Sequence, residues 1–144
     1  MREIKFRVWD RKKMIYINGM KYILLYDDGS GSIEEDGERL LIIHDDNPIM
    51  QFTGLFDKNG KEIYEGDIIY NDNHFGCVCG SGEFTDQYPS KRIIIWDNEY
   101  CQFKFEFVDI NMKGAGCSGF MLCKKNTETE FEIIGNIYEN PELL

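Results

Sequence analysis

The sequence is poor in proline and histidine, with three prolines and two histidines among 144 residues. It also has no apolar stretch near the roughly 20 residues that a transmembrane helix needs, and residues 1–5 lack the apolar core of a signal peptide. No segment repeats its apolar residues with the period of an α-helix. We therefore expect a protein of the cytoplasm that has no membrane span and little helix.

Positive charge is scarce, with 16 Lys and Arg against 26 Asp and Glu and a formal net charge of −10. Seven of the bases fall in residues 1–26, whereas residues 27–50 hold eight acids and one base. Because a molecule of this charge repels the phosphate backbone, we expect no direct binding of DNA or RNA. The concentrated bases that oppose this expectation are Arg2, Lys5, Arg7, Arg11, Lys12 and Lys13.

Cysteine is present in an odd number, which favours free thiols in a reducing compartment over a framework of disulfides. The five are Cys77, Cys79, Cys101, Cys117 and Cys123. A structural zinc site usually takes two closely spaced ligand pairs, but one residue separates the first two cysteines and five separate the last two. The thiols therefore predict neither a metal nor a cofactor, and strand patterns around Cys101 and Cys123 place these two in the core.

No set of catalytic residues stands out. His44 and His74 lie beside acids or amides in polar segments, where a solvated histidine is the usual finding. The glycines between residues 76 and 82 are not followed by a Lys-Ser or Lys-Thr pair, so they do not form a phosphate-binding loop. An enzyme would need a pocket that brings a histidine to Cys77 or Cys79. Catalytic residues therefore stay unassigned.

The turns and strands are easier to place. In residues 4–9, apolar and basic residues alternate, which predicts a half-buried strand with its bases on the outer face. Further along, Asn59-Gly60 favours a type I′ hairpin turn. Gly66 then supplies a positive φ directly before a strand at residues 68–70. Small SH3-like barrels often carry an acidic-Gly-Asp turn of this kind, so such a barrel is expected here by analogy of fold.

Two segments are expected to be exceptions to a compact barrel. Asp28-Gly29 and Asp36-Gly37 are hairpin signals inside the acidic segment 27–46, which is either a pair of hairpins or a mobile insertion whose order depends on a partner. Residues 71–90 are rich in glycine and polar side chains and are expected to form a long exposed loop.

The C-terminal half contains the best core candidates. Residues 93–96 are apolar on both faces, and residues 101–107 place phenylalanines on one face opposite polar side chains. Asn140-Pro141 predicts one helical turn at the end, with the asparagine as its cap. The predicted core residues are Ile4, Phe6, Ile68, Ile95, Phe103, Phe105 and Ile133.

These patterns predict an all-β protein: a small antiparallel barrel, with an additional N-terminal β-hairpin region and only short helical turns. At 144 residues the chain is the size of one domain, here residues 1–144. Within it, residues 1–56 and 57–144 are expected as an N-terminal β region and a barrel-like region.

Three blocks of the sequence, residues 1–10, 50–69 and 133–144, resemble the YopX family of phage and prophage proteins. They cover less than half of the chain but bracket all of it in the family's order, whereas residues 18–48 and 71–130 lie where members of the family differ. The resemblance implies a small β-rich protein encoded by a bacteriophage or a prophage. It implies an origin and a fold, and no chemistry.

The function expected from all this is a non-catalytic β module that binds another protein or a second copy of itself in the bacterial cytoplasm. Open strand edges would supply the interface. The alternative is an acidic protein that mimics the charge of DNA and blocks a nucleic-acid-binding protein of the host, through the segment 27–46. An enzyme is a further alternative, with no reaction that the residues identify.

The charge distribution generates a first prediction. Electrophoretic mobility shift with random duplex and single-stranded DNA or RNA, at two salt concentrations, is expected to show no shift at micromolar protein. The physical reason is that binding requires lysine and arginine contacts that release counterions from the phosphates, and the chain carries a net −10. A salt-sensitive shift would contradict the prediction and indicate residues 2–13 as the site.

Overall fold

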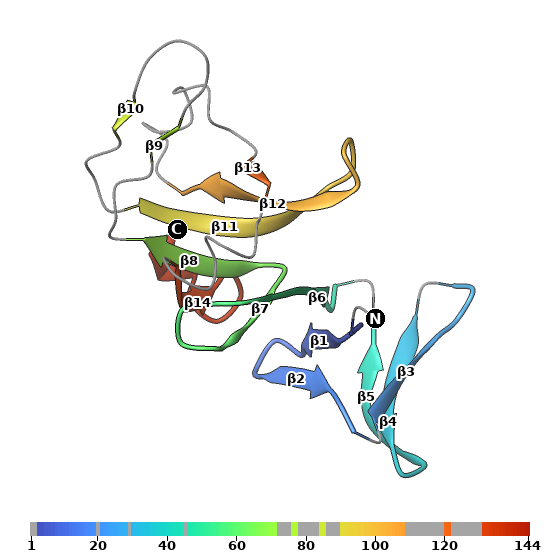
Figure 1. Cartoon of the computed structure of the whole chain (residues 1–144). Helices are drawn as coiled ribbons and strands as arrows, with labels where there is room; N and C mark the ends of the chain where they lie inside the picture. Colours follow the sequence, from blue (N-terminus) through green and yellow to red (C-terminus); the bar gives the residue numbers. More distant parts are fainter. Residues whose placement is uncertain are drawn as a thin grey trace. The chain divides into compact units, whose positions relative to one another are not determined.

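The computed structural model describes residues 3–19, 21–28, 30–44, 46–71, 76–77, 84–85, 90–108, 120–121 and 131–144. The chain divides into two compact units, Met1–Phe52 and Thr53–Leu144, and each is described by itself. Its architecture is almost entirely β, which confirms the predicted fold class (Figure 1). In the described residues the helical content is a single 3-10 turn, Pro141–Leu143, where the sequence predicts one helical turn.

Unit 1 is built from two antiparallel sheets. In the first, β1 lies between β2 and β6, and in the second, β4 lies between β3 and β5. The strands are β1 (Phe6–Trp9), β2 (Met14–Ile17), β3 (Lys21–Leu25), β4 (Gly31–Glu35), β5 (Glu38–Ile43) and β6 (Ile49–Phe56). A shared core of Val8, Ile33 and Ile43 joins the two sheets. Apolar residues that face inward from β2, β3 and β6 complete this core.

The first strand differs from its prediction. Arg7 is buried together with Val8, so β1 is covered on both faces and does not present its bases outward. Because packing covers both faces of β1, alternation with a basic residue does not mark a solvated face here. Ile4 precedes the strand and is 67% exposed, so its predicted place in the core is wrong, and Phe6 is only half-buried.

The acidic segment 27–46 forms hairpins and is part of the core of unit 1. Asp36 and Gly37 both have positive φ, 51° and 80°, as a type I′ turn between β4 and β5 requires. Ile33, in the middle of the segment, is fully buried. Gly29, in the other predicted turn, lies outside the described residues.

Unit 2 centres on a five-stranded antiparallel sheet that curls as a half-barrel, in the order β13-β12-β11-β8-β14. Its strands are β8 (Asp67–Asn71), β11 (Ser90–Asp97), β12 (Gln102–Phe107), β13 (Phe120–Met121) and β14 (Glu132–Asn136). β7 (Glu62–Tyr64) lies next to the end of β6, and β9 (Gly76–Cys77) pairs with β10 (Phe84–Thr85). Within the segment 71–90, the structure describes these four residues together with Asn71 and Ser90. The rest of the expected long loop lies outside the described residues.

The core of unit 2 lies on one face of this sheet. The register sets Phe103, Phe105 and Phe107 opposite Trp96, Ile94 and Arg92 of β11, so all six side chains share a face. Of the predicted core residues, Ile68, Phe103, Phe105 and Ile133 are buried, which confirms them. Ile95 is only half-buried, because it lies on the other face of β11 from Ile94.

The turn at residues 57–61 reverses the chain as predicted, but the predicted type I′ geometry is wrong. Gly60 has a positive φ of 79°, whereas Asn59 is not among the residues with positive φ. The cause is the carboxylate of Asp57, whose Oδ1 accepts hydrogen bonds from the N–H groups of Asn59 and Lys61 at 2.8 Å each. This side chain stabilises an αR turn that ends in a left-handed glycine.

Asp57 also joins this turn to a distant strand. Its Oδ2 accepts a hydrogen bond from the N–H of Ile133 in β14, 76 residues further along the chain, at 3.1 Å. The backbone N–H of Lys58 donates to the carbonyl of Phe131 at 2.9 Å beside it. The carboxylate itself is buried, so its three backbone donors replace the water that it would otherwise bind.

The C-terminal turn packs against the sheet at a glycine. A Cβ at Gly135 would lie 2.5 Å from Oδ1 of Asn140, so only glycine allows the approach. Asn140 is the N-cap residue before Pro141, as predicted, but its side chain makes no capping hydrogen bond. Its Oδ1 instead accepts a hydrogen bond from the N–H of Asn136 at 3.3 Å.

The role of Asp57 can be tested by substitution. Asp57→Asn replaces one acceptor oxygen with a donor that faces backbone N–H groups, so the free energy of unfolding is expected to fall by about 2 kcal/mol. The measurement is urea unfolding followed by circular dichroism. Asp10→Asn is the matched control, because Asp10 also accepts from two backbone N–H groups, those of Lys12 and Lys13, but in an exposed turn. Equal losses in the two variants would contradict the assigned role.

Candidate functional site

The histidine that the structure describes does not form a catalytic group. His44 is exposed and lines an open cavity of about 470 Å³ with Asp28, Ser30 and Asp46. Both acids are engaged locally: Asp46 forms an ion pair with Arg11, and Asp28 accepts hydrogen bonds from Ser30 that lower its pKa. In the described part of the chain, no group of three His, Cys, Asp or Glu side chains is placed to hold a metal. His74 lies outside that part.

Cys101, the one cysteine whose side chain the structure describes, likewise gives no site. Cys101 is predicted in the core but is an exposed free thiol in the turn between β11 and β12, with a positive φ of 51°. The prediction fails because β12 begins at Gln102, one residue later. Only the backbone of Cys77 is described, in β9, and Cys79, Cys117 and Cys123 lie outside the described residues.

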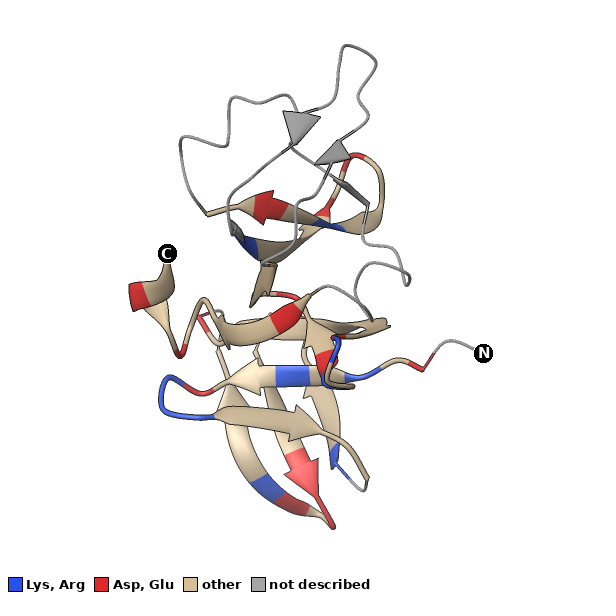
Figure 2. Ribbon diagram, turned by 60° about the vertical axis from the view of Figure 1, so that its left-hand side comes forward, with Lys and Arg blue, Asp and Glu red and all other residues tan. Residues whose placement is uncertain are grey.

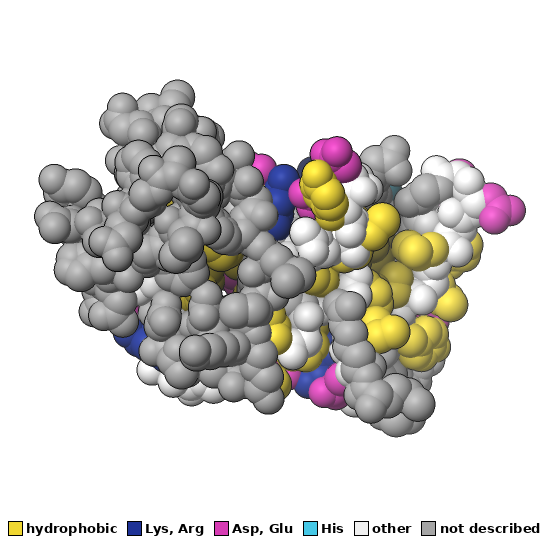
Figure 3. All heavy atoms as spheres, turned by 45° about the horizontal axis from the view of Figure 1, so that its top comes forward, with side chains coloured by type: hydrophobic (Ala, Val, Ile, Leu, Met, Phe, Trp, Pro, Cys, Tyr) yellow, Lys and Arg dark blue, Asp and Glu magenta, His cyan; other side chains and the backbone are white. Residues whose placement is uncertain are grey.

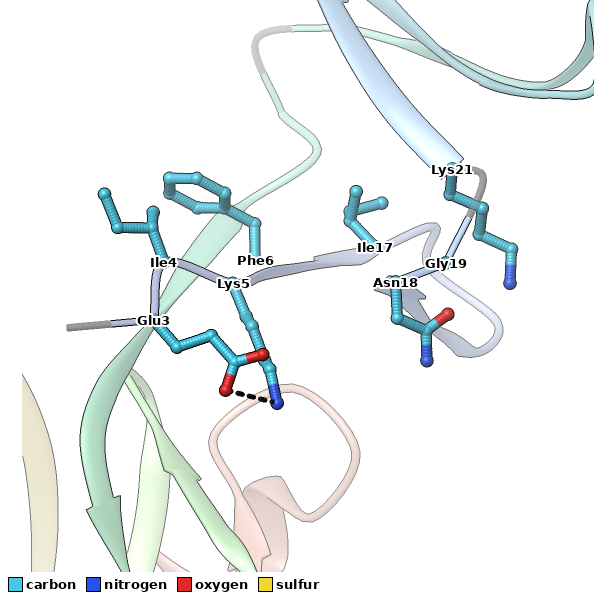
Figure 4. Close-up of a pocket in the computed structure, with 8 residues that line it drawn as sticks. All are labelled: Glu3, Ile4, Lys5, Phe6, Ile17, Asn18, Gly19 and Lys21. Atoms are coloured by element: carbon cyan, nitrogen blue, oxygen red, sulfur yellow. Dashed lines mark ion pairs between the residues drawn. The ribbon is translucent and has the colours of Figure 1, made fainter. Parts of the chain in front are cut away.

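A second open cavity, of about 320 Å³, lies where the ends of β1 and β2 meet the start of β3. Figure 4 shows Ile4, Phe6 and Ile17 on one side of the ribbon and Glu3 and Lys5 on the other. Glu3 and Lys5 form an ion pair at 3.2 Å, so their opposite charges compensate each other at the mouth of the cavity. The cavity therefore has neither a converging polar set nor an enclosed apolar wall.

The predicted basic patch does not form one surface. Arg7 is buried, Arg11 pairs with Asp46, and Lys5 pairs with Glu3. Figure 2 shows basic and acidic residues interspersed along the ribbon instead of gathered on one face.

The sequence analysis missed a buried cation. Arg92 in β11 is 1% exposed, and its guanidinium carbon lies 4.6, 4.8 and 5.3 Å from the ring centres of Phe105, Phe107 and Phe131. The guanidinium is planar and stacks favourably on aromatic faces, which is why it fits among these rings. Arg92 is part of the core, because it is 1% exposed and lies among these rings. The signal in the sequence was its place two residues before Ile94, which puts it on the same face of the strand as that apolar residue.

The feature with a functional character is an exposed apolar face in unit 1. We call it the outer face, meaning the face of the β3-β4-β5 sheet turned away from Ile33 and Ile43. Its apolar residues are Tyr22 and Leu24 of β3 and Leu40 and Ile42 of β5, and these four side chains are 39–49% exposed. Figure 3 shows hydrophobic side chains gathered over this part of unit 1.

A polar group lies in the middle of the outer face. Glu34 of β4 accepts hydrogen bonds from the hydroxyl groups of Tyr22 at 3.2 Å and Ser32 at 3.0 Å. The bond to Glu34 raises the pKa of Tyr22. Acids flank the face, with Asp27 and Asp28 beyond one end of β3 and Asp36 and Glu38 at the β4–β5 turn.

The outer face also had a signal in the sequence. Residues 22–26 and 40–43 are apolar on both faces of their strands, which is more apolar surface than one core needs. Strand alternation alone does not tell which face stays open, because that depends on which sheet packs on the other side.

Comparison with known proteins gives a family. The model of the YopX protein family matches residues 5–144. None of the curated proteins compared matches the chain.

Solved structures match over the full length. Protein EF1440 from Enterococcus faecalis is 30% identical in sequence with a TM-score of 0.62, and the match covers 100% of this chain and 99% of EF1440. Protein YopX from Bacillus subtilis is 17% identical with a TM-score of 0.58, over 100% of this chain and 99% of YopX. The second likeness shows the fold alone.

Proposed function

We propose that the chain, which belongs to the YopX family, is a non-catalytic β module that binds protein through its outer face. Membership of this family implies a fold but no reaction. The bound protein is a different chain or a second copy of this one. The setting that we propose, on the resemblance and the odd number of cysteines, is the cytoplasm of a bacterium that carries a phage or prophage. In the described residues no helix is long and apolar enough to cross a membrane.

The observation that carries the proposal is the exposure of Tyr22 and Leu24 on β3 and of Leu40 and Ile42 on β5, the two outer strands of one three-stranded sheet. Apolar side chains scattered singly over a surface are ordinary, but a contiguous group rimmed by polar residues is typical of an interaction site. Removing such a surface from water is favourable by about 25 cal/mol for each Å². The tyrosine adds a rigid amphipathic side chain, a type enriched at protein interfaces.

The flanking charge narrows the partner. Acids at both ends of the outer face favour a partner whose rim is basic, because opposite charges speed the encounter and penalise wrong partners. Glu34 in the middle already accepts from two hydroxyl groups, so it enters an interface with part of its hydrogen-bonding capacity satisfied.

A mimic of DNA fits this surface less well. Such a mimic needs rows of acids in place of phosphates, whereas apolar side chains separate the two acidic ends of the outer face. Catalysis has even less support, because the acids beside His44 are engaged by Arg11 and Ser30.

Substitution on the outer face tests the proposal. Leu40→Ser/Ile42→Ser removes two exposed apolar side chains of β5 and is expected to weaken binding of captured protein, or of the chain to itself, by about tenfold or more. The protein is immobilised, and the measurement is the amount of protein that it retains from lysate of the infected or lysogenic host. Retention of a purified second copy of the chain is measured in the same way. Thermal unfolding is expected to stay unchanged, because both side chains are already half-exposed.

The matched control is Tyr100→Ser in unit 2, which removes a side chain that is 67% exposed in the turn after β11. It is expected to retain the same proteins as the natural chain. If the outer-face variant and the control behave alike, or if neither lysate nor the chain itself supplies a retained protein, the proposed function is wrong.

A further inference from the structure

We propose that the chain forms a symmetric dimer in which β3 pairs antiparallel with β3 of a second copy, with the two Leu24 residues facing each other across the two-fold axis. The inference goes beyond the proposed function, because the second copy binds at the open edge of the sheet that carries the outer face and not over the outer face itself. It follows from the state of the β3 edge and from the residues that such a pairing brings together.

β3 is the edge of the three-stranded sheet, and β4 is its sole neighbour in the part of the chain that the structure describes. The N–H of Tyr26 donates to the carbonyl of Ser30 on the β4 side at 2.8 Å. Because the bonding direction alternates along an antiparallel strand, Ile23 and Leu25 direct their N–H and C=O groups to the open edge. An incoming strand would find a donor and an acceptor on each of these residues.

This edge lacks the devices that usually protect an edge strand, which are proline, a bulge and an inward-pointing charge. Its register with β4 is continuous from Lys21 to Leu25, and Lys21 at its start is the one charge in the strand. Leu25 is 64% exposed, and Tyr26 directly after the strand is 48% exposed. An apolar edge of this kind is expected to pair with another strand.

Charge and side-chain matching select the second copy and the register. With Leu24 on the axis, Lys21 lies opposite Asp27, which opens the turn after β3 in the second copy, and Tyr22 lies opposite Tyr26, the residue directly after that strand. Opposite charges and facing aromatic rings are both favourable cross-strand pairs. With Ile23 on the axis instead, Lys21 would face Leu25 and Asp27 would face Gly19, so the charge pair would be lost.

The same register makes the backbone bonds complete. Ile23 and Leu25 are the residues with open donors and acceptors. The register sets Ile23 of each copy opposite Leu25 of the other. The pairing continues the sheet from one copy into the next and buries the exposed Leu25 side chains on its inner side. On the outer face it joins Tyr22 and Leu24 of both copies into one apolar surface. The contact is isologous, as a closed dimer requires.

Cross-linking tests this register directly. Leu24 would face its own copy in a non-hydrogen-bonded pair, where Cα atoms lie about 4.5 Å apart, within the range of about 4.4–6.8 Å that a disulfide spans. Leu24→Cys is therefore expected to give a disulfide-linked dimer on mild oxidation. The natural chain and Ile42→Cys, at a position of the same face that is 49% exposed against 39% for Leu24, are the controls and are expected to remain uncross-linked.

The charge pair supplies a second readout. Asp27→Lys would place a lysine opposite Lys21 and is expected to raise the dimer dissociation constant, measured by sedimentation velocity, by about tenfold. Adding Lys21→Asp to it reverses the pair and is expected to restore the dimer. Glu99→Lys makes the same change of charge in the exposed turn between β11 and β12 of unit 2, and is expected to leave the dimer unchanged.

A natural chain that sediments as a monomer at every concentration, or cross-linking at Ile42→Cys equal to that at Leu24→Cys, would overturn the dimer. Neither result decides the proposed function, which is tested separately. If the monomer still retains a different protein and Leu40→Ser/Ile42→Ser loses it, the outer face binds a partner but the β3 edge does not bind a second copy.

Discussion

The carboxylate of Asp57 is the point on which unit 2 depends. It accepts backbone hydrogen bonds from Asn59 and Lys61 in its own turn and from Ile133 in β14, so one buried side chain fixes a local turn and a distant strand together. A buried carboxylate is costly unless donors surround it, and here every described donor is a backbone N–H group whose position is set by the fold. The central and C-terminal parts of the chain are therefore ordered by the same atoms.

Arg92 shows a second way in which this unit holds a charge out of water. Three phenylalanine rings surround its guanidinium. Two of them, Phe105 and Phe107, belong to β12, and the third is Phe131, the residue before β14. Replacing a buried cation with a hydrophobic residue is often tolerated in proteins, but here the side chain also sets which rings can pack around it. The aromatic core and the cation are thus a single packing unit.

Much of this fold could be predicted from the residues. Alternation located β1 and β12, and turn dipeptides located the reversals at Asp36-Gly37 and Asn59-Gly60. The errors have two causes: local side-chain hydrogen bonds that a dipeptide rule ignores, and packing by segments distant in sequence. Asp57, two residues before Asn59, selects the turn type at Asn59-Gly60, and packing on both faces of β1 buries Arg7.

The candidate site was harder to predict, for the same reason. The sequence identifies residues 22–26 and 40–43 as unusually apolar, but only the packing of Ile33 and Ile43 tells which face of their sheet remains open. Conversely, His44 and the cysteines drew attention because of their chemistry, and the structure shows His44 and Cys101 exposed, with the acids beside His44 engaged by Arg11 and Ser30.

The hydrogen bond that closes the turn at residues 57–61 also bears on how the protein ages. An asparagine followed by glycine is the pair most prone to deamidation, because the glycine nitrogen attacks the amide carbon of the preceding side chain. In this turn the N–H of Gly60 donates to the carbonyl of Asp57 at 2.9 Å, and the N–H of Asn59 is held by the Asp57 carboxylate. The backbone cannot reach the geometry of attack without opening the turn, so the chemical lifetime of Asn59 is governed by how often unit 2 opens locally.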